Sequence, residues 1–294
     1  MGTDPVSHFI QVRDGLRLHA RLHGEPDDRR LPVVCLPGLS RTAEDFDRLA
    51  RHLAAEGRRV LALDYRGRGL SAWDPEPRNY DLQVESNDIA DVLTALGITR
   101  ATFVGTSRGG LHIMLLGALR PAFLAAAVLN DIGPVIDPAG LTRIKGYIGK
   151  APPLPDWDAT LAALKRIGAG HFTDLDEAEW RAYAELTFQE KDGRIVGRYD
   201  PGLMVNLAAM DLDKVPELWP QFDGLAALPL LVVRGANSDL LSPATAAIML
   251  ARHPGAALVT VAGQGHAPLL RDAPTIDRIA AFVARQDGQA GQVG

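Results

Sequence analysis

The chain has 294 residues, of which 47% are hydrophobic and 23% are charged, and its formal net charge is −5 at pH 7. This composition is typical of a soluble globular protein with a sizeable core. The mild charge and the lack of any basic run argue against a nucleic-acid partner. No apolar run approaches about 18 residues, and the N-terminus lacks a signal-peptide pattern, so we expect a cytoplasmic protein with no membrane partner.

The first 130 residues alternate between strand and helix patterns. Asp14-Gly15 predicts a hairpin over residues 8–24, because this dipeptide favours a tight turn. Apolar runs that end at turn residues then predict strands, and segments of helical periodicity predict helices between them. The predicted strands are 31–36, 59–64, 101–105 and 125–130, and the predicted helices are 46–56, 84–96 and 108–120. This alternation indicates a parallel sheet covered on both faces.

The alternation stops after Pro134 and resumes near residue 228. Between them lie five candidate elements: helices over 137–148, 157–169, 176–188 and 202–210, and a hairpin over 191–199. Strands then follow at 228–234 and 257–261, with helices at 244–252 and 275–285. We therefore predict a core domain made of residues 1–134 and 223–294, with residues 135–222 inserted as a helical cap.

The main chemical motif is Gly105-Thr106-Ser107-Arg108-Gly109, a G-x-S-x-G sequence. It follows an apolar strand and opens a helix, which is the setting of a nucleophile elbow. Two residues either side of the serine, any side chain would collide with neighbouring backbone, and this favours glycine there. We therefore predict Ser107 as a nucleophile, against the alternative of a tight turn with an incidental serine.

A serine nucleophile needs an adjacent base, and His266 is the histidine best placed to serve. It lies in a loop after the last predicted strand, and loops at the carboxyl ends of parallel strands are where such sheets build sites. The other seven histidines are interpreted as surface or packing residues. In the order Ser…Asp/Glu…His, the acid that orients the base falls between residues 107 and 266. Asp239 and Asp131 both follow predicted strands there; we prefer Asp239 and keep Asp131 as the alternative.

An oxyanion intermediate would need two backbone N–H donors. One is expected from Arg108, which follows the nucleophile, and the other from Leu39, in the loop after the 31–36 strand. The side chains of Arg108 and Arg41 have two equal interpretations, as cations at the mouth of the site or as solvated surface groups. Cys35, the single cysteine, lies in a buried-strand pattern and is interpreted as a core residue.

Taken together, these motifs resemble the α/β-hydrolase superfamily, in its capped esterase and epoxide-hydrolase-like branch. Residues 64–71, which read DYRGRGLS, match that branch's D-x-R-G-x-G-x-S loop, a mainly structural element. Residues 228–235, followed by Ser238-Asp239, are similar to the family's acid-bearing strand. The resemblance implies a mostly parallel eight-stranded α/β sheet with helices on both faces and an inserted helical cap, and it supports Asp239 as the acid.

The sequence departs from the family at two places. The oxyanion loop reads Pro37-Gly38 where His-Gly is common, and the elbow has Arg108 where methionine is frequent. The first departure should not affect the backbone donor at Leu39, because that donor does not depend on the preceding side chain. The second places a long cation beside the site, which puts a purely lipid-like substrate in doubt. A serine nucleophile also argues against epoxide-hydrolase and dehalogenase chemistry, which needs a carboxylate.

These residues predict a serine esterase that cleaves small carboxylic esters through an acyl-enzyme, with no cofactor and no metal. A lactonase, a C–C bond hydrolase or a cofactor-free perhydrolase would use the same triad. A non-catalytic ligand receptor on the same scaffold is the alternative from another class. We expect a monomer or a homodimer, and the sequence leaves the acyl and alcohol groups open.

Overall fold

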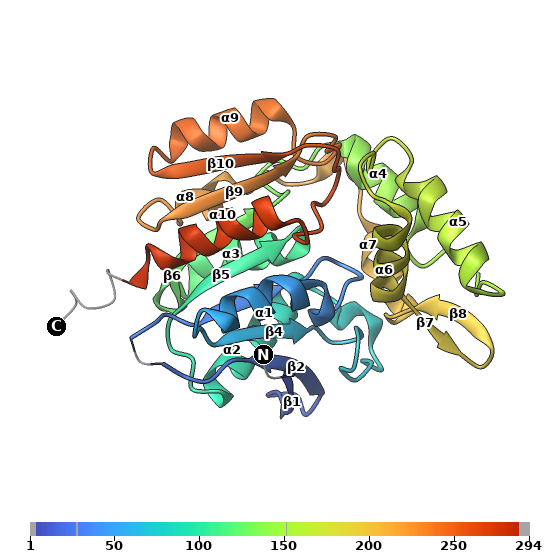
Figure 1. Cartoon of the computed structure of the whole chain (residues 1–294), viewed down its shortest axis with the longest axis horizontal. Coiled ribbons are helices and arrows are strands. Elements are labelled where there is room, and N and C mark those ends of the chain that lie inside the picture. The colour runs from blue at the N-terminus through green and yellow to red at the C-terminus, as the bar shows by residue number, and fades with distance from the viewer. Residues whose placement is uncertain (1–3, 28, 151, 288–294) are drawn as a thin grey trace.

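The computed structural model describes residues 4–27, 29–150 and 152–287. Within these ranges, eight strands form one sheet in the order β1-β2-β4-β3-β5-β6-β9-β10 (Figure 1). Its strands are β1 (Val6–Gln11), β2 (Arg17–His23), β3 (Val33–Leu36), β4 (Val60–Asp64), β5 (Ala101–Thr106), β6 (Leu124–Asn130), β9 (Leu230–Gly235) and β10 (Ala256–Val261). Strand β2 is antiparallel to both of its neighbours, β1 and β4, and from β4 onward all neighbours are parallel.

Helices cover both faces of this sheet. They are α1 (Asp47–Ala55), α2 (Leu82–Ala95), α3 (Arg108–Leu119), α8 (Trp219–Asp223), α9 (Pro243–Arg252) and α10 (Ala273–Ala284). Alternate side chains of each buried strand point to opposite faces. In β3, Val34 and Leu36 join the apolar cluster under α2, α3 and α9, whereas Val33 and Cys35 join the cluster under α1 and α10. The eight-stranded α/β sheet predicted from the sequence is confirmed, as is the core position of Cys35.

Most of the segment between β6 and β9, up to α8, leaves the sheet and gathers at one end of it (Figure 1). It contains α4 (Pro138–Tyr147), α5 (Trp157–Gly168), α6 (Glu177–Thr187), the hairpin strands β7 (Phe188–Lys191) and β8 (Arg194–Gly197), and α7 (Met204–Ala209). Its two ends meet, because the N–H of Leu218 donates to the carbonyl of Pro134 at 2.7 Å. We call residues 135–217 the inserted segment.

Two local differences from the sequence prediction follow from packing. Helix α8 was not predicted; it is short, and it is stable because Phe222 packs into the core cluster beside α3. The predicted hairpin turns at Asp192-Gly193 as expected, but its first strand begins at Phe188, inside the range predicted as helix. Among the described residues, no helix is long and apolar enough to cross a membrane.

Candidate active site

Ser107 lies on a sharp turn between β5 and α3. Its φ of 52° is in the left-handed region, which a non-glycine residue seldom adopts. A Cβ on Gly105 would lie 2.5 Å from the Gly109 backbone, and one on Gly109 would lie 2.0 Å from the Leu36 carbonyl oxygen. Both positions therefore require glycine, as the motif predicted, and the turn holds the serine hydroxyl at the carboxyl end of the strand.

His266 lies in the loop between β10 and α10 and contacts the serine. Its Nε2 is 2.9 Å from Ser107 Oγ, and its Nδ1 is 2.8 Å from Asp131 Oδ2. These contacts assign the proton to Nδ1, which donates to the carboxylate, and leave Nε2 to accept from the hydroxyl. Three segments that are far apart in the sequence thus meet in one hydrogen-bonded chain.

Asp131 directly follows β6 and is fully buried. One carboxylate oxygen accepts the Gly235 N–H at 2.8 Å, and the other accepts the Ser238 hydroxyl at 2.5 Å in addition to His266. Because β6 lies between the parallel strands β5 and β9, the residues that follow these three strands lie together at the carboxyl end of the sheet. Ser238 is a contributor that sequence reasoning missed, although it stands next to the residue that was chosen.

Asp239, predicted as the acid, is not the carboxylate beside His266, and this assignment is corrected to Asp131. The Asp239 carboxylate instead accepts two hydrogen bonds from Arg143 of α4, at 2.6 Å from Nε and 2.8 Å from Nη2. Burial acts to raise the pKa of Asp239, but the Arg143 guanidinium outweighs it and holds that pKa below its ordinary value. In the turn after β9, Ser238 faces Asp131 while Asp239 faces the inserted segment.

The two predicted oxyanion donors lie on either side of the nucleophile. Arg108 is the first residue of α3, where backbone N–H groups have no partner inside the helix. The Pro37–Leu39 loop follows β3, and a Cβ built on Gly38 would lie 3.9 Å from the Ser107 Cβ. No hydrogen-bond acceptor is found for the Leu39 N–H among the described residues. The structure thus brings the Pro37–Leu39 loop and the start of α3 together at Ser107.

The two arginine side chains behave differently from each other. Arg108 turns away from the nucleophile, and its Nε donates to the buried Glu85 at 2.6 Å. Arg41 lies at the site, where it pairs with Asp45 at 2.6 Å and stands over the Tyr183 ring at 4.7 Å. The arginine next to the serine is therefore held by a buried carboxylate, whereas the Arg41 side chain stays close to His266.

A cavity of about 100 Å³ opens beside His266, between the sheet and the inserted segment. Its walls are mainly apolar and aromatic, with polar groups at intervals. It is lined by Ser40, Arg41, Arg143, Tyr147, Ile148, Leu164, Ile167, Gly168, His171, Phe172, Tyr183, Thr187, Phe188, Tyr199 and His266. Arg143 and His171 were not singled out from the sequence, because nothing in their local pattern separates them from surface residues.

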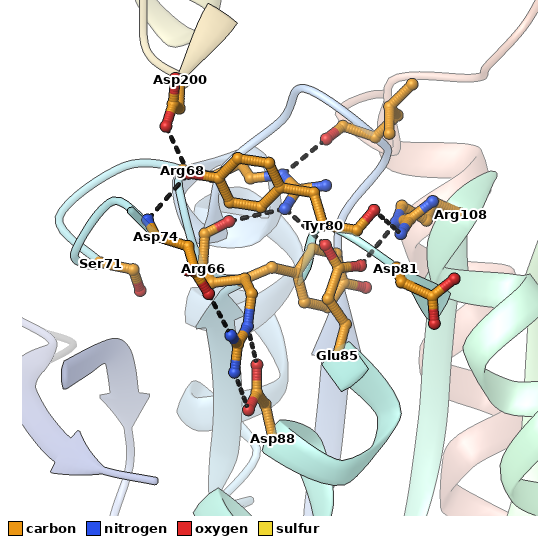
Figure 2. A network of polar contacts seen from close by, with 12 residues as sticks. Arg66, Arg68, Ser71, Asp74, Tyr80, Asp81, Glu85, Asp88, Arg108 and Asp200 are labelled. Carbon is orange, nitrogen blue, oxygen red and sulfur yellow. Dashed lines mark hydrogen bonds and ion pairs between the residues drawn. The ribbon is translucent and has the colours of Figure 1, made fainter. Parts of the chain in front are cut away.

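The D-x-R-G-x-G-x-S loop lies beside the site and is built of internal contacts. The Asp64 carboxylate accepts from His19 at 2.7 Å and from the Ala43 N–H at 2.7 Å. Arg66 is fully buried and pairs with Asp88 at 2.6 Å (Figure 2). These contacts agree with a structural role for the loop. Across the described residues, no group of three or more histidine, cysteine or acidic side chains is arranged to hold a metal ion.

Comparison with known proteins matches residues 33–278 to the family described as the alpha/beta hydrolase family. A 3-hydroxybutyrate-oligomer hydrolase from Cupriavidus necator is 33% identical over 282 residues, covering 92% of this chain and 95% of that protein. Esterase YbfF from Escherichia coli is 27% identical, covering 80% of this chain and 85% of that protein. A crystal structure of an alpha/beta hydrolase from Novosphingobium aromaticivorans superposes with a TM-score of 0.89 at 41% identity, covering 96% of this chain and 99% of that one.

Proposed function

Because the chain belongs to the α/β-hydrolase family, we propose that it hydrolyses small carboxylic esters through an acyl-enzyme formed on Ser107. One observation carries this proposal: the hydrogen-bonded chain from Ser107 Oγ through His266 to Asp131, with links of 2.9 and 2.8 Å. A hydroxyl, an imidazole and a buried carboxylate in this order are the parts of a serine hydrolase triad. Similarity to proteins named as an esterase and an oligomer hydrolase supports the same reaction class.

In the first half-reaction, Ser107 Oγ attacks the ester carbonyl while His266 Nε2 takes its proton. Asp131 keeps the Nδ1–H tautomer in place and stabilises the imidazolium without taking the proton. The tetrahedral intermediate collapses, the C–O bond to the alcohol breaks, and His266 returns the proton to the leaving oxygen. Water then attacks the acyl-enzyme by the same route, and the acid is released.

The backbone N–H groups of Leu39 and Arg108 would stabilise the oxyanion in both halves. Donors fixed before the reaction stabilise developing charge without having to reorganise, and removing one typically costs about 10²–10³-fold in turnover. Arg108 and the Pro37–Leu39 loop are both anchored by contacts to the core, which suits this requirement.

For the substrate, we propose a short acyl or alcohol chain that carries a carboxylate. The cavity beside His266 is small, and its lining includes the guanidinium groups of Arg41 and Arg143. Each guanidinium pairs with an aspartate, Asp45 or Asp239, through only some of its five N–H groups, so the others could donate to a substrate carboxylate. An oligomer of 3-hydroxybutyrate, named for the Cupriavidus necator relative, joins hydroxy acids by ester bonds and ends in a carboxylate. We also propose that the inserted segment acts as a cap, since it supplies most of this cavity's lining.

The proposal is tested by comparing the wild-type protein with Ser107→Ala. A fluorophosphonate probe should label the wild type and not the variant, and ester turnover should fall by at least about 10³-fold because the nucleophile is lost. Circular dichroism and thermal unfolding should show that the variant is folded. Labelling of Ser107→Ala at the wild-type rate would contradict the assignment.

A substrate panel separates the rival reactions. The wild type should turn over p-nitrophenyl butyrate, and a p-nitrophenyl ester with a terminal carboxylate should have the higher kcat/KM. Faster turnover of lactones or of ring-cleaved β-diketones would favour those chemistries, and peroxide-dependent halogenation would favour a perhydrolase. A protein that binds esters without turnover, and binds equally well as Ser107→Ala, would be a receptor.

A further inference from the structure

Glu85 of α2 is a fully buried carboxylate between two arginines (Figure 2). Its Oε1 accepts from Arg68 Nη1 at 2.6 Å, and its Oε2 accepts from Arg108 Nε at 2.6 Å. His112, also fully buried, lies 3.1 Å from the same Oε2 through its Nε2. None of these side chains takes a proton or contacts substrate in the proposed reaction, so their burial calls for another explanation.

Each arginine connects Glu85 to one of the two expected oxyanion donors. Arg108 is itself the donor residue at the start of α3. Arg68 Nε donates to the carbonyl oxygen of Leu39, the other expected donor residue, at 2.8 Å. One carboxylate thus holds the helix start on one side of Ser107 and the loop on the other.

Further contacts make this connection stiff. The Arg68 guanidinium stands 5.5 Å from the ring centres of both Tyr65 and Tyr80. Tyr65 donates its hydroxyl to the Pro37 carbonyl at 3.2 Å, which fixes the other end of the oxyanion loop. The Arg108 Nη2 also donates to the Tyr80 carbonyl at 3.2 Å. The loop and the helix start are therefore held to one buried cluster.

The charges in the cluster require a carboxylate at its centre. Burial alone would raise the pKa of Glu85, but Arg108 and Arg68 outweigh it and hold the pKa well below its ordinary value. Burial lowers the pKa of His112, which therefore adds no third positive charge. Without the Glu85 charge, two guanidinium groups would repel each other in a low-dielectric interior and pull on both donor residues.

We propose that Glu85 is a positioning residue that sets the spacing of the oxyanion hole by holding Leu39 through Arg68 and Arg108 directly. This inference rests on the proposed ester hydrolysis. It assigns a reason to one departure in this chain, the arginine that follows the nucleophile, since Arg108 and Arg68 meet at one carboxylate.

Asp88 provides a matched control on the same helix. It is also buried and pairs with a buried arginine, Arg66, at 2.6 Å, but it makes no contact with Arg68 or Arg108. Glu85→Gln and Asp88→Asn each replace a buried carboxylate by an amide of the same shape. Loss of stability is expected in both, whereas misplaced oxyanion donors are expected only in the first.

The experiment measures kcat, KM and the inhibition constant of a phenylboronic acid for both variants at pH 8. For Glu85→Gln we expect kcat to fall about 10–100-fold and boronic-acid affinity to fall in parallel, with KM within about threefold. For Asp88→Asn we expect all three within about threefold of wild type. A boronic acid forms a tetrahedral adduct on serine, so it reports the oxyanion site while KM reports ground-state binding.

Arg108→Met provides a second test of the same connection if Glu85→Gln does not fold. It retains the backbone donor and removes the side-chain contacts with Glu85 and the Tyr80 carbonyl, so kcat and boronic-acid affinity should fall together. Where both variants fold, the double variant should be no worse than Glu85→Gln alone, since the two changes break one connection. Wild-type constants in Arg108→Met, or equal losses in Glu85→Gln and Asp88→Asn, would overturn the inference. A wild type without esterase activity or probe labelling would instead refute the proposed function.

Discussion

Two aspartates at the same edge of the sheet have entirely different surroundings. Asp131 follows β6, is fully buried and is held by a backbone N–H, a hydroxyl and an imidazole. Asp239 follows β9, is about one-fifth exposed and pairs with Arg143 of the inserted segment. Adjacent parallel strands present their ends side by side, so either loop is placed to carry an acid. The turn after each strand decides which carboxylate faces the histidine and which one faces outward.

The largest expected effect comes from exchanging each carboxylate for its amide. Asp131→Asn should lower kcat by about 10⁴-fold, because an amide N–H at Nδ1 favours the tautomer whose Nε2 carries a proton and cannot accept one. Asp239→Asn should leave kcat within about threefold, since no hydrogen bond joins residue 239 to His266 in the described structure. Steady-state kinetics on p-nitrophenyl butyrate checks both.

Thermal unfolding of the two variants provides the control for this comparison. Asp131→Asn should remain folded, so that its low turnover reports the chemistry. A large loss of kcat in Asp239→Asn, together with a small one in Asp131→Asn, would restore the acid first predicted from the sequence.

A smaller effect is expected on stability. Asp239→Asn removes a charge-assisted, two-point contact that is partly exposed, so the free energy of unfolding should fall by about 1 kcal/mol at pH 7. The depressed pKa of Asp239 means that this contribution is present above its ordinary value of 3.8 and is lost as the pH falls below it. The melting temperatures of wild type and variant should therefore converge as the pH falls from about 4 towards 2. A constant gap across that range would show that the ion pair is not its source.

The smallest expected effect tests whether the contact between Asp239 and Arg143 stabilises only the inserted segment or the sheet as well. Cys35 is fully buried in β3, and burial raises the pKa of its thiol, so it should resist iodoacetamide in the native protein. Its labelling rate should be the same in wild type and Asp239→Asn, because breaking the contact with α4 leaves β3 closed. Faster labelling in the variant would mean that the contact stabilises the whole sheet.

The sequence predicts the backbone of this molecule better than the directions of its side chains. Asp14-Gly15 predicted the first hairpin, and the apolar runs predicted the buried strands, because turn chemistry and burial patterns are local. The Ser107 turn was predicted for the same reason, since its two glycines are required by nearby backbone. The choice between Asp131 and Asp239 failed because it depends on how a seven-residue turn folds back against a neighbouring strand.

Long polar side chains were harder still to place. Arg108 was expected at the mouth of the site or in solvent, yet it reaches a buried carboxylate 23 residues earlier in the chain. Glu85 was not singled out, since a lone glutamate in a helical pattern is most often a surface residue. Only the packing of α2 against α3 brings the two together, and that contact is not encoded in either segment alone.

The hydrogen bond between Pro134 and Leu218 joins the two ends of the inserted segment, so the segment begins and ends at the same place in the fold. The chain leaves the sheet three residues after Asp131 and returns to the same place, without crossing any strand. A segment of another length could therefore be inserted at this junction without displacing the hydrogen-bonded Ser107, His266 and Asp131. Under the proposed function, such an exchange would change which substrates fit the cavity and would leave the reacting groups unchanged.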